Sequence, residues 1–510
     1  MTNHGKLKII ILLSILVGLT CYTHLWNVTG FPFIDVDEGH YLRKAISTLE
    51  GEGFQPQNRY LSPYFGQMFL AGIFKTIGFP NFIVNDSSQS PATIEGLFLV
   101  PRVLVGSLAI VDLILIWKIT ERRYNKRVAL ISSILFAVMP YNLMTRTVLL
   151  ESIQLPLMLT SILLLLYSNS GAKHEKKISI IVSGLFMGLA IFTKIPAFTI
   201  IPLGIFLIYT NTKRWKYLAL WLIPCMLVPS LWPMHAALSG DLDEWVKGII
   251  YQTNREGRSL IDSLHDFLLT DPVFFILGIG GFAFSVLKRD IFLILWIAPL
   301  IAFFYLIGYV VPFHLIILIP SFCITGALLL DSICQKLVKT FKLRVIQYAL
   351  ISSIVVFSLI NTSMLISLEL NSNYYKAVSF LVAQIPSKGD NAENRSDARN
   401  HNNEFAIIAS PEYLWIPQSI FNKSFDTHSY YSSKGIKADR FIMMIDDRFL
   451  SILGDTSTSR SKNFNVAFNS THSLKKFDEK FIDMMDLKKY PFTSLRVNNN
   501  TKMIDIRSNY

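Results

Sequence analysis

Two adjacent carboxylates, Asp37 and Glu38, follow the first apolar segment of the chain, which spans about residues 9–26. An apolar segment of that length can cross a bilayer, so the pair is expected at a membrane surface. A carboxylate held there is suited to take a proton from the hydroxyl group of a substrate. The structural alternative is that both acids serve as the N-cap and first turn of a helix that begins near Gly39, where negative charge is favourable.

The composition identifies the kind of protein that must position these acids. The chain has 510 residues, of which 51% are hydrophobic, and its mean hydropathy is +0.41. The apolar residues come in long blocks, which is typical of a polytopic helical membrane protein. The formal net charge is +12, but the basic residues gather in short connections between apolar blocks. Membrane topology explains that pattern, and we expect no nucleic-acid partner.

Hydropathy predicts about eleven membrane spans. They lie near 9–26, 94–117, 128–142, 147–167, 178–193, 196–211, 217–235, 273–287, 291–309, 313–331 and 346–366. Five basic clusters fall in alternate connections, at 118–127, 173–177, 213–216, 288–289 and 336–344. By the positive-inside rule, these connections and the N-terminus are cytoplasmic.

The same alternation predicts the domain organisation and the location. Residues 1–369 are expected to form an all-α, multi-pass domain in the cell membrane, with long outer loops at 27–93 and 236–271. Residues 370–510 are expected to form a small extracytoplasmic α/β domain. Its predicted strands are Phe405–Ile408, Phe441–Ile445 and Met503–Ile506. The aromatic residues of Pro411–Trp415 could stack on sugar rings, but packing in the core of this domain is the favoured interpretation.

Several short motifs occur in a characteristic order along residues 10–330. They are Asp37-Glu38-Gly39-His40-Tyr41, then Ala45 and Gly51, then Ser62-Pro63-Tyr64-Phe65-Gly66, Pro101-Arg102, a glycine-containing span that ends in Thr193-Lys194, and a Trp-Pro stretch within Leu231–Trp245. This arrangement resembles the polyprenyl-phosphate-sugar-dependent glycosyltransferases of the GT-C fold. That family includes the protein O-mannosyltransferases of glycosyltransferase family 39 and the lipid A aminoarabinose transferases.

The resemblance implies a reaction. The donor would be a sugar, mannose or a related one, on polyprenyl or dolichyl monophosphate within the bilayer lipid. Asp37 would be the base that takes the proton of the acceptor hydroxyl, and Glu38 would orient it or help to bind the acceptor. Displacement in one step would invert the anomeric carbon. The acceptor could be a protein, a lipid or a glycan.

A phosphate leaving group needs cations, and the outer side offers four candidates. They are Lys194, Arg102, Arg255 and Arg258. Each has a structural alternative: a snorkelling lysine for the first, a buried ion pair for the second, and a solvated charged loop for the last two. Glu151 could pair with Arg146 or contact the substrate.

Residues on the acceptor or sugar side are expected to be His40, Tyr41, Tyr64 and Glu151. The outer histidines have no metal-ligand spacing. A divalent metal cation at Glu38 or Glu151 is nevertheless an open alternative, and no other cofactor is expected.

Two functions from other classes compete with the enzyme. A transporter could use the intramembrane charges Arg102, Asp112 and Glu151 to line a path, although the sequence has no internal two-fold repeat. A non-catalytic receptor or assembly protein could use the polar tail to bind a partner.

Overall fold

The computed structural model describes residues 3–54, 60–84, 89–168, 173–255, 257–341, 344–385, 405–409, 411–423, 425–428, 440–445, 488–489 and 505–508. These residues divide into two compact units. Unit 1 comprises Met1–Val28, Phe54–Phe69 and Pro101–Ser367, and unit 2 comprises Thr29–Gly53, Leu70–Val100 and Leu368–Tyr510. The boundary predicted after residue 369 stays a prediction, and the early segments 29–53 and 70–100 also belong to unit 2.

Unit 1 is helical in the part that the structure describes. Its elements are α1 (Asn3–Leu25), α6 (Lys126–Val138), η2 (Pro140–Arg146), α7 (Leu150–Tyr167), α8 (Lys173–Thr193), η3 (Ile195–Ile200), α9 (Ile201–Thr212), α10 (Trp215–Leu238), α11 (Leu242–Thr253), α12 (Leu260–Thr270), α13 (Pro272–Leu287), α14 (Ile291–Ile307), η4 (Pro312–Leu318), α15 (Ile319–Phe341) and α16 (Arg344–Ile366). Two further helices, α3 (Phe65–Ile77) and α5 (Pro91–Arg123), contribute residues to both units.

Each of the eleven predicted spans coincides with a helix. Among the described residues, seven helices are long and apolar enough to cross a membrane, and the bent pair α6–η2 makes an eighth. The other three are shorter apolar helices, at Ile9–Leu25, Pro272–Leu287 and Ile291–Ile307. The prediction of a polytopic helical membrane protein is thus confirmed.

The basic connections lie at one end of the unit 1 helices. Contacts join these connections to residues at or near the ends of neighbouring helices: Arg123 with Asp290 (3.3 Å), Arg127 with Asp331 (2.6 Å), Lys176 with the carbonyl of Asn211 (3.1 Å), and the Arg122 guanidinium carbon with the ring centroid of Tyr167 (5.2 Å). The basic connections that alternate along the sequence therefore lie together at one end of the helices in the structure.

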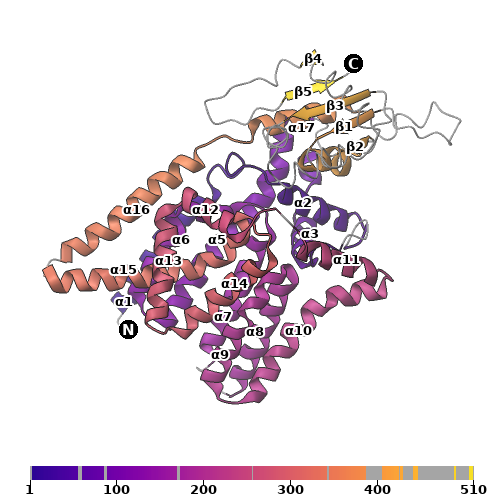
Figure 1. Ribbon diagram of the computed structural model, residues 1–510. Helices are drawn as coiled ribbons and strands as arrows, with labels where there is room; N and C mark the ends of the chain where they lie inside the picture. The colour runs from indigo at the N-terminus through magenta and orange to yellow at the C-terminus, as the bar shows by residue number, and fades with distance from the viewer. Residues whose placement is uncertain are drawn as a thin grey trace. The chain divides into compact units, whose positions relative to one another are not determined.

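Helices α7, α8, α9 and α10 run side by side (Figure 1). The contact between α8 and α10 depends on glycine. A Cβ atom added to Gly184 would lie 2.3 Å from the carbonyl oxygen of Trp221, and one added to Gly188 would lie 2.7 Å from that of Pro224. Neither position has room for a side chain, so the two backbones approach closely.

Unit 2 contains α2 (Val36–Leu49), α4 (Asn81–Val84), α17 (Ser372–Gln384), α18 (Pro411–Trp415), the π-helical turn η5 (Ile416–Ile420) and five strands. The strands are β1 (Phe405–Ile408), β2 (Asp426–His428), β3 (Arg440–Ile445), β4 (Lys488–Lys489) and β5 (Asp505–Ser508). Strand β1 coincides with its prediction, β3 begins one residue earlier, and β5 lies two residues later than expected.

The sheet of unit 2 has the order β2-β1-β3-β5-β4. Strand β1 is parallel to β2 and β3, whereas β5 is antiparallel to β3 and β4. The neighbouring residues Ala406 and Ile407 of β1 are both fully buried. Because neighbouring side chains in a strand point to opposite faces, both faces are covered there, as parallel strands require.

Candidate functional site

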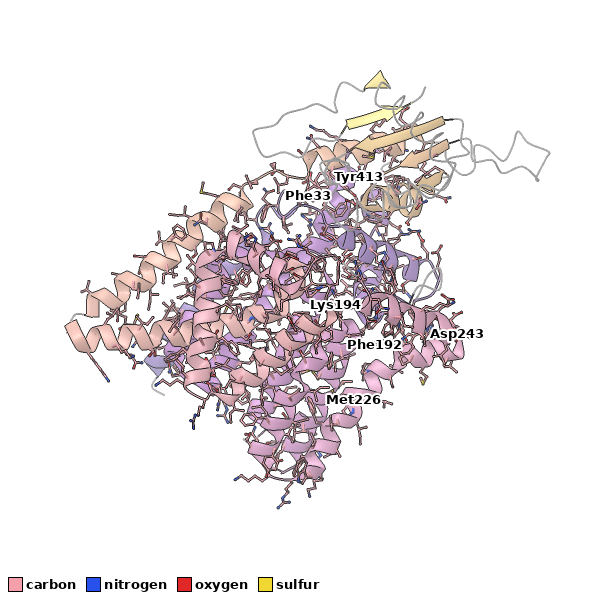
Figure 2. The ribbon with its side chains drawn as sticks, viewed as in Figure 1. Phe33, Phe192, Lys194, Met226, Asp243 and Tyr413 are labelled. Carbon is pink, nitrogen blue, oxygen red and sulfur yellow. The ribbon has the colours of Figure 1, made fainter. Side chains whose placement is uncertain are left out.

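A buried ion pair joins Glu151, in the first turn of α7, to Lys194, which follows the last residue of α8. The side chain of Glu151 is 2% exposed and that of Lys194 is 15% exposed. The Nε2 atom of His314, on η4, lies 3.8 Å from the Glu151 Oε1 atom. Lys194, labelled in Figure 2, follows the C-terminus of α8, Glu151 lies in the first turn of α7, and His314 precedes α15, so all three are at the helix ends remote from the basic connections.

Proline and an amide side chain explain why the backbone turns at Lys194. Pro196 cannot continue α8, because it lacks an N–H and its ring would clash with the carbonyl four residues earlier. Lys194 is therefore extended (φ −155°, ψ 132°) as the N-cap of η3. Gln154, one turn after Glu151, donates from Nε2 to the carbonyls of Ala190 and Lys194. The hydrogen bonds of Gln154 thus hold the end of α8, where Lys194 leaves the helix, against α7.

Aromatic rings surround the cations at this end. The Lys194 Nζ atom lies 5.3 Å from the ring centroid of Phe313, and the Arg255 guanidinium carbon lies 3.9 Å from that of Tyr309. Both cations are close enough to His314 for their charges to act on its imidazole ring. The structure therefore brings together two of the four cations predicted to bind phosphate.

Arg258 forms an ion pair with Asp266, and its backbone carbonyl accepts from the N–H of Val310 at 2.8 Å. Both side chains of this pair are partly exposed. The ion pair joins Arg258 to α12, and the backbone bond joins it to the segment before η4. A phosphate-binding role for Arg258 stays a prediction.

Arg102 and Arg146 are fully buried and serve the end of α1. Arg102 donates to the carbonyl of Val28 at 2.9 Å, while Arg146 donates to those of Thr23 (3.0 Å) and Trp26 (2.5 Å). Carbonyls at a helix C-terminus lack intrahelical partners and favour positive charge. This placement favours a structural role for both arginines, and the partner of Glu151 is Lys194 rather than Arg146.

Tyr64 belongs to a packed aromatic cluster of unit 1. Its ring stacks on Phe54 (5.1 Å between centroids) and meets Phe192 edge-on (4.8 Å), and its hydroxyl donates to the carbonyl of Leu231 at 3.4 Å. Nearby, the Tyr60 hydroxyl donates to Asp241 at 3.1 Å. Burial and this carboxylate raise the pKa of Tyr60 above its ordinary value, so it remains a donor.

Unit 2 holds the acidic pair. The N-cap of α2 is Asp35, whose side chain accepts from the backbone N–H of Asp37 at 2.9 Å. Asp37 and Glu38 are first-turn acids, as the structural alternative predicted, but the helix begins three residues before Gly39. Glu38 is fully buried, whereas Asp37 is half-buried.

The surroundings of Glu38 come from α17 and α18. A Cβ atom added to Gly39 would lie 2.9 Å from Trp415 Nε1, so α2 packs directly on α18. Burial and, next, the charge of Glu412 raise the pKa of Tyr374 well above its ordinary value, with a smaller contribution from Glu38.

The aromatic side chains of unit 2 are packed. Tyr413 and Trp415 are almost fully buried, which confirms core packing rather than sugar stacking for this motif. Tyr41 is 6% exposed, and the His40 ring lies 6.0 Å from it in an edge-on contact. Roles for His40 and Tyr41 in substrate binding stay predictions.

No cluster of three or more histidine, cysteine, aspartate or glutamate side chains occurs among the residues that the structure describes. Glu151 is paired with a lysine, which would compete with a cation. The alternative of a divalent cation at Glu38 or Glu151 therefore receives no support from the geometry.

Comparison with known proteins gives the class. A family model described as dolichyl-phosphate-mannose-protein mannosyltransferase matches residues 97–232. The apo structure of ArnT from Cupriavidus metallidurans is 10% identical, with a TM-score of 0.61 over 100% of this chain and 99% of that one. ArnT bound to undecaprenyl phosphate is 9% identical, with a TM-score of 0.57 over 98% of each chain.

A further solved structure has the same fold. The oligosaccharyltransferase AglB from Archaeoglobus fulgidus, in complex with an inhibitory peptide and a dolichol-phosphate, is 11% identical, with a TM-score of 0.58 over 91% of this chain and 71% of that one. No curated protein sequence matches the chain. The protein is a multi-pass membrane protein of the GT-C fold, and the resemblance to glycosyltransferases that use polyprenyl-phosphate sugars is confirmed.

Sequence reasoning missed three contributors to the site. His314 was not singled out among the outer histidines, Gln154 was overlooked, and the capping role of Asp35 was given to the acids after it. The spacing of Gln154 three residues after Glu151 on one helix face was a usable signal. The pairing of Glu151 with Lys194 depends on how α7 packs against α8.

Proposed function

We propose that this protein is a membrane glycosyltransferase that moves a sugar from polyprenyl or dolichyl phosphate to an acceptor hydroxyl on the extracytoplasmic side. The basic connections would face the cytoplasm, and the end that carries Lys194 would face outward. The observation that carries the proposal is the pair of cations Lys194 and Arg255, which lie beside the His314 ring at the end of a GT-C helix bundle.

In this reaction the acceptor oxygen attacks the anomeric carbon while the bond from that carbon to the phosphate oxygen breaks. The electron pair of the broken bond goes to the phosphate, and Asp37 takes the acceptor proton. Inversion at the anomeric carbon follows from a single displacement. Lys194 and Arg255 stabilise the negative charge that grows on the departing phosphate.

Asp37 is the better candidate for the base because this residue is partly exposed, whereas Glu38 is buried. Within the described part of the chain, no hydrogen bond or ion pair engages the Asp37 carboxylate, since Asp35 provides the helix cap. Glu38 is buried and is suited to orient the first turn of α2.

The donor class has support from the relatives, whose structures hold undecaprenyl phosphate and dolichol-phosphate. AglB was also solved with an inhibitory peptide, which favours a protein as the acceptor. The transporter alternative has no such support. Arg102 donates to a backbone carbonyl and Glu151 is paired, so these charges serve helix packing.

The test compares cells that lack this protein with cells complemented by wild-type, Asp37→Asn or Asp243→Asn protein. Asp243 is an exposed first-turn acid of α11 and provides the matched control (Figure 2). Mass spectrometry of surface glycans should show a sugar that wild type and Asp243→Asn restore and Asp37→Asn does not. Unchanged glycans after loss of the protein would refute the proposal.

A biochemical arm uses protein in proteoliposomes with dolichyl-phosphate mannose as the probe donor. Loss of a general base should lower kcat by about 10²–10⁴-fold in Asp37→Asn. Full activity in that variant would exclude Asp37 as the base.

A further inference from the structure

The segment 29–34, which leads into the acidic turn of α2, has no regular secondary structure. Its backbone groups therefore need partners from elsewhere in unit 2. Asn371, far along the chain, supplies partners for four of them. The Asn371 side chain is fully buried.

The Asn371 amide uses both of its ends on this segment. Its Nδ2 donates to the carbonyls of Thr29 (2.7 Å) and Pro32 (2.9 Å), with a longer contact to that of Gly30 (3.3 Å). Its Oδ1 accepts from the N–H of Ile34 at 3.1 Å. A single side chain thus engages both ends of the segment.

Asn371 does this instead of its usual local task. It is the N-cap of α17, a position where asparagine commonly accepts from the helix N–H groups. Here its side chain makes no cap hydrogen bond. The side-chain amide of Asn371 therefore bonds to the backbone of the 29–34 segment and not to the N–H groups of α17.

Two neighbours reinforce the same contact. The Tyr375 hydroxyl, one turn into α17, donates to the carbonyl of Thr29 at 2.8 Å, and the N–H of Leu370 donates to that of Gly30 at 2.9 Å. The Thr29 hydroxyl in turn donates to Glu95 at 2.7 Å. These bonds fix the backbone up to Ile34, the residue immediately before the N-cap Asp35.

We propose that Asn371 is a positioning residue for catalysis, which acts by holding the 29–34 segment so that the first turn of α2 presents Asp37 in its reactive orientation. This inference rests on the proposed role of Asp37 as the base. It gives the segment after the last membrane span a catalytic purpose, because α17 holds the acidic turn.

The test measures donor turnover with dolichyl-phosphate mannose for Asn371→Ala and Tyr375→Phe, each alone and combined with Asp37→Asn. A misplacement of about 1 Å can cost about 10²-fold in rate, so kcat of Asn371→Ala should fall by that order with the donor KM nearly unchanged. Tyr375→Phe removes one bond without opening a cavity and should show a smaller loss.

The double variant of Asn371→Ala with Asp37→Asn distinguishes a positioning role of Asn371 from a general structural effect. If Asn371 acts through Asp37, Asn371→Ala should cause no further loss in the Asp37→Asn background. An equal loss in both backgrounds would overturn the proposal. The matched control is Asn211→Ala, because Asn211 also donates to a distant carbonyl, that of Leu165 at 2.8 Å, beside the basic connections. It should retain kcat.

Hydrogen exchange provides a readout that does not depend on activity. The Ile34 and Asp37 amides should lose protection in Asn371→Ala, while thermal melting shows that the protein remains folded. Unchanged protection would refute the contact as a support. An inactive wild type with a protected segment would instead indicate that the proposed function is wrong.

Discussion

Glu151 of unit 1 and Asp37 of unit 2 are both acids in the first turn of a helix, and the structure treats them differently. Glu151 is buried and paired with Lys194, and its helix α7 has no side-chain N-cap. Asp37 is half-exposed, and Asp35 caps its helix. The same local position therefore holds a buried, paired carboxylate in one unit and a partly exposed carboxylate in the other.

The largest loss of stability is expected from breaking the Glu151–Lys194 ion pair of unit 1. Lys194→Met leaves the Glu151 carboxylate buried without its cation, which should cost about 3–5 kcal/mol of unfolding free energy. Denaturant unfolding in detergent measures it. The double variant Glu151→Leu with Lys194→Met should recover much of the loss, and an equally unstable double variant would contradict a true pair. Asp37→Asn should be nearly neutral by the same measure.

Unit 2 should respond more to packing than to charge. Gly39→Ala places a methyl group against the buried Trp415 ring, and overpacking of this kind costs about 1–3 kcal/mol. The control is Gly72→Ala in α3, where an added Cβ atom meets nothing within 4 Å. Thermal unfolding should show a loss for the first and a small gain for the second, since alanine favours helices. Equal behaviour of both would refute close packing of α2 on α18.

Asp35→Ala tests whether capping leaves Asp37 available. Loss of an N-cap side chain costs about 1 kcal/mol, and asparagine at the same position should retain most of that stability. Local hydrogen exchange in α2 measures the change. No difference between the alanine and asparagine variants would argue against the cap.

The smallest effect concerns a third first-turn acid, Asp262 of α12, whose carboxylate forms a capping box with Ser259. Hydrogen bonds from the backbone and hydroxyl of Ser259 lower the pKa of Asp262. A lowered pKa contributes stability above the ordinary value near 3.8 that is lost as the pH falls through the lowered value. The protection factors of the α12 amides, corrected for the intrinsic pH dependence of exchange, should therefore fall towards acidic pH in wild type. A wild-type pH response identical to that of Asp262→Asn would contradict this.

Much of the fold was predictable because its signals are local. Long apolar blocks mark the spans, and basic residues mark their ends, so the eleven helices could be located from hydropathy alone. Strand β1 was predicted at its observed position from a short apolar run bounded by polar residues. Such features depend on neighbours within about 20 residues.

The candidate site was predictable only in part, because its contacts join distant residues. Lys194 and Glu151 were each singled out, yet their partnership joins positions 43 residues apart. Asn371 was not singled out at all, since its carbonyl partners lie 342 residues away at Thr29 and 339 at Pro32. Side chains that support irregular backbone have no periodic pattern in the sequence.

Gly184 and Gly188 allow the backbones of α8 and α10 to come into close contact, so the interface between these helices depends on shape complementarity. Lipid tails are as apolar as leucine, so close contact between the backbones, rather than expulsion of water, must hold two helices together in a bilayer. This interface should tolerate exchange of the surrounding lipid, but it should not tolerate the substitution of either glycine by alanine. Helix α8 ends at Thr193, immediately before Lys194. A side chain added at Gly184 or Gly188 would push α8 away from α10 and would therefore displace the Lys194 ammonium, although the substitution lies inside the membrane.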